Sequence, residues 1–232
     1  MACSFPSSGT SPFCVAKKMR NSMQRDIFPS KNLGSFVTTS HDAETTLMAA
    51  ANFHKNQACV EEYASISKYQ QECISMLADL WRRRPSDNPF GTATTGSSEA
   101  VMLAGLAMKR ACQEKNACFD RRLNVVVGSN AHACVFKFAA YFELETRVVP
   151  VTAGSNYVFD VRQLEGKLDR DTVGVFLTLG STYTGHYDPI LQVSKQLDDY
   201  EARTGISLPI HVDAASGGFV APFTPGAEDL VW

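Results

Sequence analysis

From residue 123 onward, short apolar runs typical of buried strands alternate with runs whose apolar residues recur at helical spacing. The apolar runs are LNVVVGS, TRVVPV, TVGVFLTL and SLPIHVD. Helical patterns lie between them, at residues 131–144, 160–168 and 189–203. Strands that alternate with helices of about ten residues predict βαβ units and a mostly parallel sheet covered on both faces. We therefore expect an α/β fold.

The sequence upstream of this alternation has a different character. Residues 42–82 have a helical pattern, and a further apolar helix is expected from Glu99 to about Gln113. The first 25 residues are rich in serine and basic residues, with no acidic residue before Asp26, which favours a disordered tail over a transit peptide. The predicted organisation is a disordered tail over 1–25, an N-terminal helical segment over 26–85 and a partial large α/β domain over 86–232.

Composition excludes several classes of function. The chain of 232 residues is 44% hydrophobic and 20% charged, with a formal net charge of -2, so its overall charge favours neither nucleic acid nor a membrane surface. No apolar run is long enough to span a bilayer. The seven cysteines are scattered and form no Cys-x-x-Cys pair. Together with the absence of an apolar signal segment, this predicts reduced thiols in a cytoplasmic protein.

Polar clusters follow strands or precede helices at three places in the predicted fold. They are Gly96-Ser97-Ser98, the segment 178–184, and Asp213. Ligands of open α/β sheets bind outside the carboxyl ends of the strands, which is where these clusters are expected to meet. The convergence predicts a binding site without naming its ligand.

Two of these features have both a binding and a purely structural interpretation. Ser97 and Ser98 open a helix after Gly96, so their hydroxyls and free backbone N–H groups suit a phosphate, although a serine there also serves as a helix cap. His132 stands at the start of the next predicted helix. Its ring could stack on a planar cofactor, or it could be satisfied by a loop carbonyl.

Asp213 is the most informative residue, because a carboxylate at the end of a buried strand is costly unless it meets a cation. A protonated ring nitrogen would be such a cation, and the pairing would keep the ring electron-withdrawing. Ala214, Ala215 and Gly217 leave room for a flat ring, and Ala215 could pack against one of its faces. The structural alternative is a helix cap or a turn cap by Asp213. A metal site formed with His211 is not expected, because no third ligand lies nearby.

Several segments, in this order and spacing, resemble the glutamate decarboxylases, which are group II decarboxylases dependent on pyridoxal 5′-phosphate (PLP). The segments are NLGSFVTT, MLADLW, GTATTGSSEA, GSNAHACVFKFAAYFELE, LGSTYTGHYDPI and PIHVDAASGGFVAPF. The resemblance runs from about residue 26 to residue 232. It implies the large domain of a fold-type I PLP enzyme. The implied reaction converts L-glutamate to 4-aminobutyrate and CO2. The resemblance also implies that the full-length enzyme is a dimer or a higher homo-oligomer.

The resemblance also implies roles for individual residues. Ser97 and Ser98 would hold the cofactor phosphate, while His132 and Ala215 would pack on opposite faces of the pyridine ring. Asp213 would pair with the ring nitrogen. The other implied contacts come from three threonines: Thr178 and Thr182 would line the cofactor pocket, and Thr39 would help to bind the distal carboxylate of the substrate.

The pattern of the family continues into a Ser-x-His-Lys motif that carries the Schiff-base lysine, and only nineteen residues follow Asp213 here. The sole His-Lys pair, His54-Lys55, lies in the wrong segment. We therefore expect a C-terminally truncated chain that is inactive and poorly stable by itself, since the lysine serves nucleophilic and proton-transfer roles. A non-catalytic truncated paralogue and a gene-model fragment are the alternatives.

Substrate choice is the second departure from the family pattern. Cys59 stands where the family has an aspartate near the site of the distal carboxylate, and Ser40 replaces a tryptophan. Val135 and Phe136 also differ from the residues usual in the family. These changes lie on the substrate side, so a PLP decarboxylase of another amino acid remains an alternative.

Overall fold

The computed structural model describes residues 6–31, 41–116 and 121–225. The chain divides into two units, residues 1–54 and 55–232. The first unit contains α1 (Pro12–Met23), the short 3-10 helix η1 (Pro29–Lys31) and α2 (Ala43–Asn52). Helix α1 lies where the sequence predicted a disordered tail. It begins with Pro12, whose fixed φ suits the first helical position, and none of its residues is buried.

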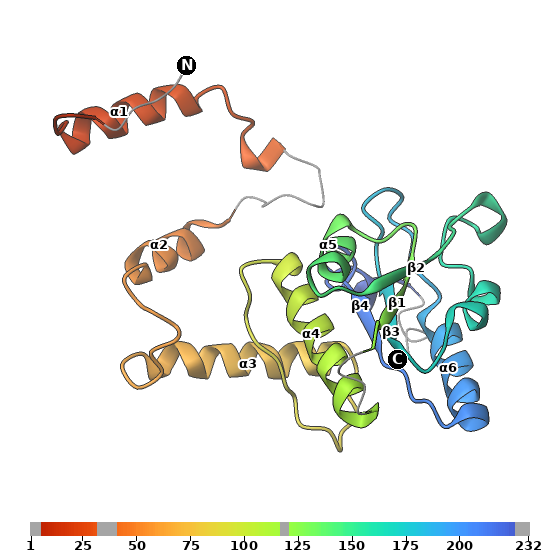
Figure 1. Cartoon of the computed structure of the whole chain (residues 1–232). Helices are drawn as coiled ribbons and strands as arrows, with labels where there is room; N and C mark the ends of the chain where they lie inside the picture. The colour runs from red at the N-terminus through yellow and green to blue at the C-terminus, as the bar shows by residue number, and fades with distance from the viewer. Residues whose placement is uncertain (1–5, 32–40, 117–120, 226–232) are drawn as a thin grey trace. The chain divides into compact units, whose positions relative to one another are not determined.

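The second unit is built on a parallel sheet of four strands (Figure 1). The strands run in the order β2-β1-β3-β4, and all three neighbouring pairs are parallel. Their bounds are Asn124–Gly128 for β1, Glu145–Val149 for β2, Thr172–Thr178 for β3 and Ile210–Asp213 for β4. The predicted α/β fold with a parallel sheet is confirmed. Strands β1, β3 and β4 lie inside apolar runs identified in the sequence, and β2 begins one residue before its run.

Helices cover both faces of the sheet. They are α4 (Ser97–Asn116), α5 (Ala133–Tyr141) and α6 (Ile190–Thr204); α3 (Ala64–Leu80) precedes them in the chain and has no buried residue. Helices α4 and α5 pack on one face, where Phe138 and Phe176 belong to the same buried cluster. Helix α6 packs on the other face through Val193 and Leu197 (Figure 1). Alternate residues of β1 divide between the two clusters, as a strand buried on both sides requires.

The segment 160–168 differs from the predicted amphipathic helix. It forms two short 3-10 helices, η3 (Val161–Gln163) and η4 (Glu165–Lys167). The side chain of Asp160 accepts a hydrogen bond from the Arg162 backbone N–H at 3.2 Å, which starts a tight turn in place of an α-helix. Two further 3-10 helices, η2 (Ala153–Ser155) and η5 (Ala221–Phe223), lie in loops at the carboxyl end of the sheet.

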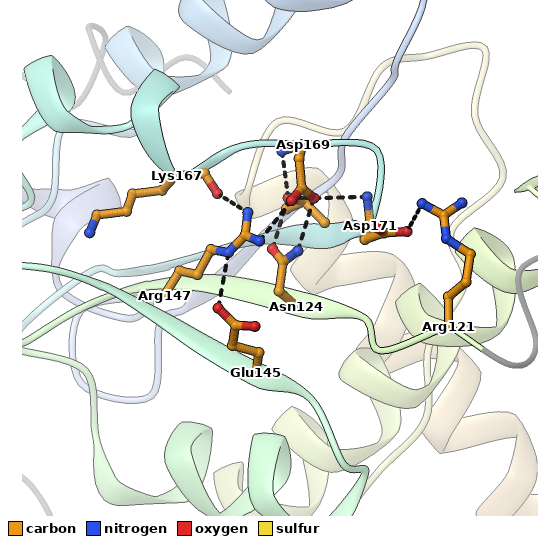
Figure 2. A network of polar contacts seen from close by, with 8 residues as sticks. Arg121, Asn124, Glu145, Arg147, Lys167, Asp169 and Asp171 are labelled. Carbon is orange, nitrogen blue, oxygen red and sulfur yellow. Dashed lines mark hydrogen bonds and ion pairs between the residues drawn. The ribbon is translucent and has the colours of Figure 1, made fainter.

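Polar side chains connect the amino ends of three strands (Figure 2). The carboxylate of Asp169, in the loop before β3, accepts a hydrogen bond from Asn124 Nδ2 at 2.9 Å and pairs with Arg147 at 2.7 Å. Thr172 Oγ1 donates to Asn124 Oδ1 at 2.8 Å. Because Asn124 and Thr172 begin β1 and β3 and Arg147 lies in β2, these contacts hold the strand starts in register.

Within the described residues, the structure contains no helix with the length and apolar character needed to cross a membrane.

Candidate functional site

A cavity of about 790 Å³ opens beside the carboxyl end of β4. Its lining includes Ser97 from the start of α4, and Asp213 and Ala215 from the end of β4 and the loop that follows. Trp81 and Phe219 also line it. Part of the cavity continues along β4 toward α6, past Leu208 and Ile210. The cavity therefore joins residues that are more than 100 positions apart in the sequence.

The start of α4 has the features of an anion site. Gly96 precedes the helix, and its carbonyl accepts the backbone N–H groups of Glu99 and Ala100. The Glu99 carboxylate turns back to accept the Thr95 N–H at 2.6 Å, and this bond holds the Glu99 pKa below its usual value. The backbone N–H groups of Ser97 and Ser98 have no acceptor among the described residues. They are therefore available to an external anion at the positive end of the helix.

Asp213 ends β4 opposite Thr178, the last residue of β3. One carboxylate oxygen, Oδ1, accepts the Ala215 N–H at 3.2 Å, as expected for a turn cap. Among the described residues, the second oxygen has no hydrogen-bond donor and no cationic partner. The cap and the binding interpretation are therefore compatible, because the cap uses only one oxygen of the carboxylate.

The loop after Asp213 follows a path that only small residues allow. The Gly217 N–H donates to Leu179 O at 2.9 Å, and a Cβ at Gly217 would lie 2.3 Å from that same oxygen. Trp81, at the end of α3, donates its indole N–H to Gly218 O at 2.8 Å. Two hydrogen bonds therefore hold this loop beside the cavity, one to Leu179 just after β3 and one from Trp81.

His132 caps the start of α5. Its Nδ1 accepts the Cys134 N–H at 3.3 Å, and Nε2 and the faces of the exposed ring have no partner among residues 6–31, 41–116 and 121–225. Cys134 is only 2% exposed. Burial raises the Cys134 pKa, the nearby Asp213 charge raises it further, and a hydrogen bond with the Ser98 side chain opposes both effects. Cys134 thus lies at a junction between Ser98, His132 and Asp213.

The structure brings four of the predicted cofactor-binding residues toward this junction and the cavity: Ser97, Ser98, His132 and Asp213. Ala215 lies on the cavity wall. Thr178 is buried at the end of β3, and its backbone N–H donates to Asp188. Thr182 is exposed in the turn that follows β3. Thr39, predicted to bind the substrate, lies outside the described residues.

Asp188 is a structural residue of this site that the sequence analysis did not identify. Its carboxylate, 4% exposed, accepts hydrogen bonds from Asn130 Nδ2 at 3.0 Å, Phe159 N at 2.9 Å and Thr178 N at 2.8 Å. These donors come from the loop after β1, the segment before η3 and the end of β3. A single buried carboxylate therefore ties together three segments at the carboxyl end of the sheet. The only local signal was an aspartate that directly precedes a proline and a helix.

Comparison with known proteins identifies the family. Residues 27–229 match the model of the pyridoxal-dependent decarboxylase conserved domain. The chain belongs to this family. It is 40% identical over 227 residues to glutamate decarboxylase of Saccharomyces cerevisiae, which covers 95% of this chain and 39% of that protein. It is also 40% identical over 210 residues to glutamate decarboxylase 3 of Arabidopsis thaliana, covering 88% of this chain and 41% of that protein.

A solved structure supports the same grouping. Glutamate decarboxylase from Lactobacillus brevis superposes with a TM-score of 0.88 and 30% identity, covering 97% of this chain and 52% of that chain. A sphingosine-1-phosphate lyase from Burkholderia pseudomallei, with a TM-score of 0.80 and 19% identity, shares the fold. The chain spans about two fifths of the length of the curated relatives it matches.

The residues present fit pyridoxal phosphate as this family's cofactor. The open N–H groups and hydroxyls of Ser97 and Ser98 suit a phosphate, and the unused oxygen of Asp213 suits a protonated ring nitrogen. The small side chains of Ala214 and Ala215 leave the cavity wall flat enough for a ring. Phosphate and ring nitrogen would be held by separate elements, α4 and β4, with Cys134 of α5 between them.

Proposed function

We propose that this chain supplies the cofactor-binding part of a PLP-dependent glutamate decarboxylase, which converts L-glutamate to 4-aminobutyrate and CO2. The observation that carries the proposal is that Ser97 and Asp213 line the same cavity. Ser97 begins a helix and its backbone N–H has no acceptor among the described residues, while one oxygen of the Asp213 carboxylate accepts a hydrogen bond and the other remains available. The identity of 36–40% to glutamate decarboxylases of fungi, plants and bacteria supports the choice of substrate.

Each residue has a distinct task in this proposal. Ser97 and Ser98 bind the phosphate through backbone N–H groups and hydroxyls at the positive end of α4. Asp213 accepts a hydrogen bond from the ring nitrogen and keeps the proton on that atom. His132 and Ala215 pack on the two ring faces and exclude water. The bound cofactor supplies an electron-withdrawing ring that accepts the electron pair left when CO2 departs.

Three threonines complete the proposed site. Thr178 and Thr182 line the cofactor pocket, and Thr39 binds the distal carboxylate of glutamate. The backbone N–H of Thr178 is already used by Asp188, so its contribution would come from its hydroxyl. We further propose a cytoplasmic protein that acts as a homodimer or a higher homo-oligomer.

The 232 residues contain no Ser-x-His-Lys motif, and we propose that they are inactive on their own. The decisive experiment joins them to the segment that follows the matching region in the Saccharomyces cerevisiae relative. Release of CO2 from L-glutamate by the joined protein, and none by the 232 residues alone, is the expected result. An Asp213→Asn variant of the joined protein is the matched control and should lose this activity.

Substrate specificity needs its own comparison, because Cys59, Val135 and Phe136 depart from the pattern usual in the family. The joined protein is assayed for CO2 release from L-glutamate, L-aspartate and an aromatic amino acid. Turnover of L-glutamate at the highest kcat/KM supports the proposal. Turnover restricted to a non-acidic amino acid would show that the cofactor assignment is right and that the glutamate assignment is wrong.

A further inference from the structure

His211 is a partly buried titratable residue beside the cavity that the proposed function does not use. It lies on β4 opposite Phe176 of β3, and the two ring centroids are 4.7 Å apart. Phe176 in turn stacks on Phe138 of α5, with centroids 5.4 Å apart. The imidazole is therefore packed at the end of an aromatic row that crosses the buried face of the sheet, and its other side lines the cavity.

Asp213 shares this face of β4, because side chains two positions apart on a strand point to the same side. The charge of Asp213 acts on the His211 ring, but among the described residues the two side chains form no ion pair. In the described part of the chain, no hydrogen-bond partner is found for either ring nitrogen of His211. One oxygen of Asp213 is likewise unused. The cavity thus contains a carboxylate and an imidazole whose polar atoms are both open to a ligand or to water.

The charge state of His211 follows from its surroundings. Burial lowers the His211 pKa, and the charge of Asp213 opposes this shift without cancelling it. Asp213 is the charged group whose field reaches the ring. Of the other titratable groups near the cavity, the Cys134 pKa is raised so that the thiol stays neutral, and Asp198 extends from α6 on the opposite face of the sheet. Glu99 of α4 is engaged by Thr95. His211 is therefore neutral at neutral pH.

We propose that His211 is a positioning residue for the pairing between Asp213 and a protonated ring nitrogen, because its ring is held on Phe176 beside the carboxylate and forms no ion pair with it among the described residues. This inference rests on the proposed function. Protonation of His211 would place a second cation beside Asp213, and that cation would compete with the ring nitrogen. The site therefore binds a pyridinium ligand well at neutral pH and less well in acid.

The direction of this pH dependence follows from linkage. A bound cation next to Asp213 disfavours the protonated form of His211, so the His211 pKa is lower in the complex than in the free chain. Affinity is then full above the pKa of the free chain and falls as the pH drops through it. The loss requires both residues. Removing the charge of Asp213 should remove the effect of His211 as well.

The test measures binding of pyridoxine 5′-phosphate to the 232-residue chain by the ligand's fluorescence. This probe has the ring and phosphate of the cofactor but an alcohol in place of the aldehyde, so it cannot condense with surface lysines. Dissociation constants are measured at a series of pH values from about 7.5 down to about 4.5, because the lowered pKa of His211 places its protonation below the usual histidine pKa. The variants are His211→Gln, which keeps a hydrogen-bonding side chain, and His211→Phe, which keeps an aromatic ring on Phe176.

The wild-type chain should lose affinity in acid by about three- to tenfold more than either His211 variant. Protonation of the ligand phosphate affects all chains alike and cancels in this comparison. In an Asp213→Asn background, His211→Gln should leave the pH dependence unchanged. Inorganic phosphate, which lacks the ring, should bind all the chains with the same pH dependence.

Two results would overturn the inference and leave the proposed function intact. One is an equal acid loss in the wild type and both His211 variants, when Asp213→Asn still weakens binding at about pH 7.5. The other is a weaker pH dependence of affinity in His211→Gln that is also seen in the Asp213→Asn background, since the effect of His211 would then not act through Asp213. If neither Asp213→Asn nor a Ser97→Ala, Ser98→Ala double variant weakens binding, the proposed function itself fails.

Discussion

Both ends of the sheet carry polar side chains, but the polar groups at one end are paired with one another and several at the other end are not. At the amino ends of the strands, the polar groups of Asn124, Arg147 and Asp169 are engaged with one another (Figure 2). At the carboxyl ends, the N–H groups of Ser97 and Ser98 have no acceptor in the described part of the chain, and there one oxygen of Asp213 accepts a hydrogen bond while the other does not. A satisfied network stabilises the fold, whereas an unsatisfied one is available for a ligand.

The amino-end network is nearly self-sufficient. Asp169 accepts hydrogen bonds from Asn124 Nδ2 and from the Asp171 N–H at 2.8 Å, and it pairs with Arg147. Arg147 also donates to Lys167 O at 2.8 Å, and Arg121 pairs with Asp171. Each charge therefore has an opposite charge or a hydrogen-bonding partner within the same set of loops. Because these polar groups are paired with one another, they are largely unavailable to a ligand.

The carboxyl end contains one satisfied carboxylate beneath its open groups. Asp188 accepts three hydrogen bonds and is 4% exposed, while Asp213 accepts one and lines the cavity. These two aspartates differ in their expected roles, since one stabilises the loops and the other is proposed to bind the cofactor. Asp188 holds together the loops at this end of the sheet, and Asp213 lines the cavity in which we propose that the cofactor binds. Mutations should therefore affect stability in one case and ligand affinity in the other.

The largest expected effect is that of Asp188→Ala. It leaves two backbone N–H groups and the Asn130 amide without their buried acceptor, which should lower the free energy of unfolding by about 3–5 kcal/mol. Urea denaturation measures this change. Asp199→Ala, which removes an exposed carboxylate from α6, is the matched control and should change stability by less than about 0.5 kcal/mol. Equal effects of the two substitutions would show that Asp188 is not a structural anchor.

Asp213→Asn should have the next largest effect, on binding and not on folding. Loss of a charge-assisted hydrogen bond predicts an affinity for pyridoxine 5′-phosphate that is about 10- to 100-fold weaker at neutral pH. Stability should be unchanged or slightly higher, because asparagine can still accept the Ala215 N–H through its side-chain oxygen. Fluorescence titration and urea denaturation of the same variant measure the two quantities. A large loss of stability with unchanged affinity would reverse the roles assigned to the two aspartates.

Local signals account for the parts of this molecule that the sequence predicted correctly. The four strands were found because an apolar run bounded by polar residues needs no knowledge of the rest of the chain. Asp213 was singled out for a similar reason, since a charge directly after an apolar strand is visible in a few residues, and its role in cofactor binding stays a prediction. The glycine before Ser97 and Ser98 marked the start of α4 in the same way.

Features that depend on distant partners could not be predicted in this way. The donors to Asp188 come from Asn130, Phe159 and Thr178, so its role is visible only once three segments are folded together. The junction at Cys134 has the same character. The segment 160–168 was misassigned because its apolar spacing fits an amphipathic helix, while the Asp160 cap and the contacts of Leu164 in the core favour short 3-10 turns.

At the opposite end of the sheet, Asp169→Ala should lower stability by about 1–2 kcal/mol and leave ligand affinity unchanged. The carboxylate is partly exposed, so its pairing with Arg147 is weakened by solvent, but Asn124 loses a hydrogen bond as well. Urea denaturation and pyridoxine 5′-phosphate titration together test the separation between the two ends. A loss of affinity comparable with that of Asp213→Asn would show that the ends are coupled.

The smallest expected effect is the contribution of Asp169 to acid stability. Burial acts to raise the Asp169 pKa, but hydrogen bonds from Asn124 and Arg147 outweigh it, so the pKa lies below its usual value. A carboxyl group with a lowered pKa in the folded state stabilises the fold above the pKa of the unfolded chain. That stabilisation is lost as the pH falls through the folded-state pKa. The free energy of unfolding should therefore decline more steeply between about pH 5 and pH 3 in the wild type than in Asp169→Asn. Parallel slopes in the two chains would mean that the amino-end network does not depend on this charge, and that its hydrogen bonds alone hold the strand starts in register.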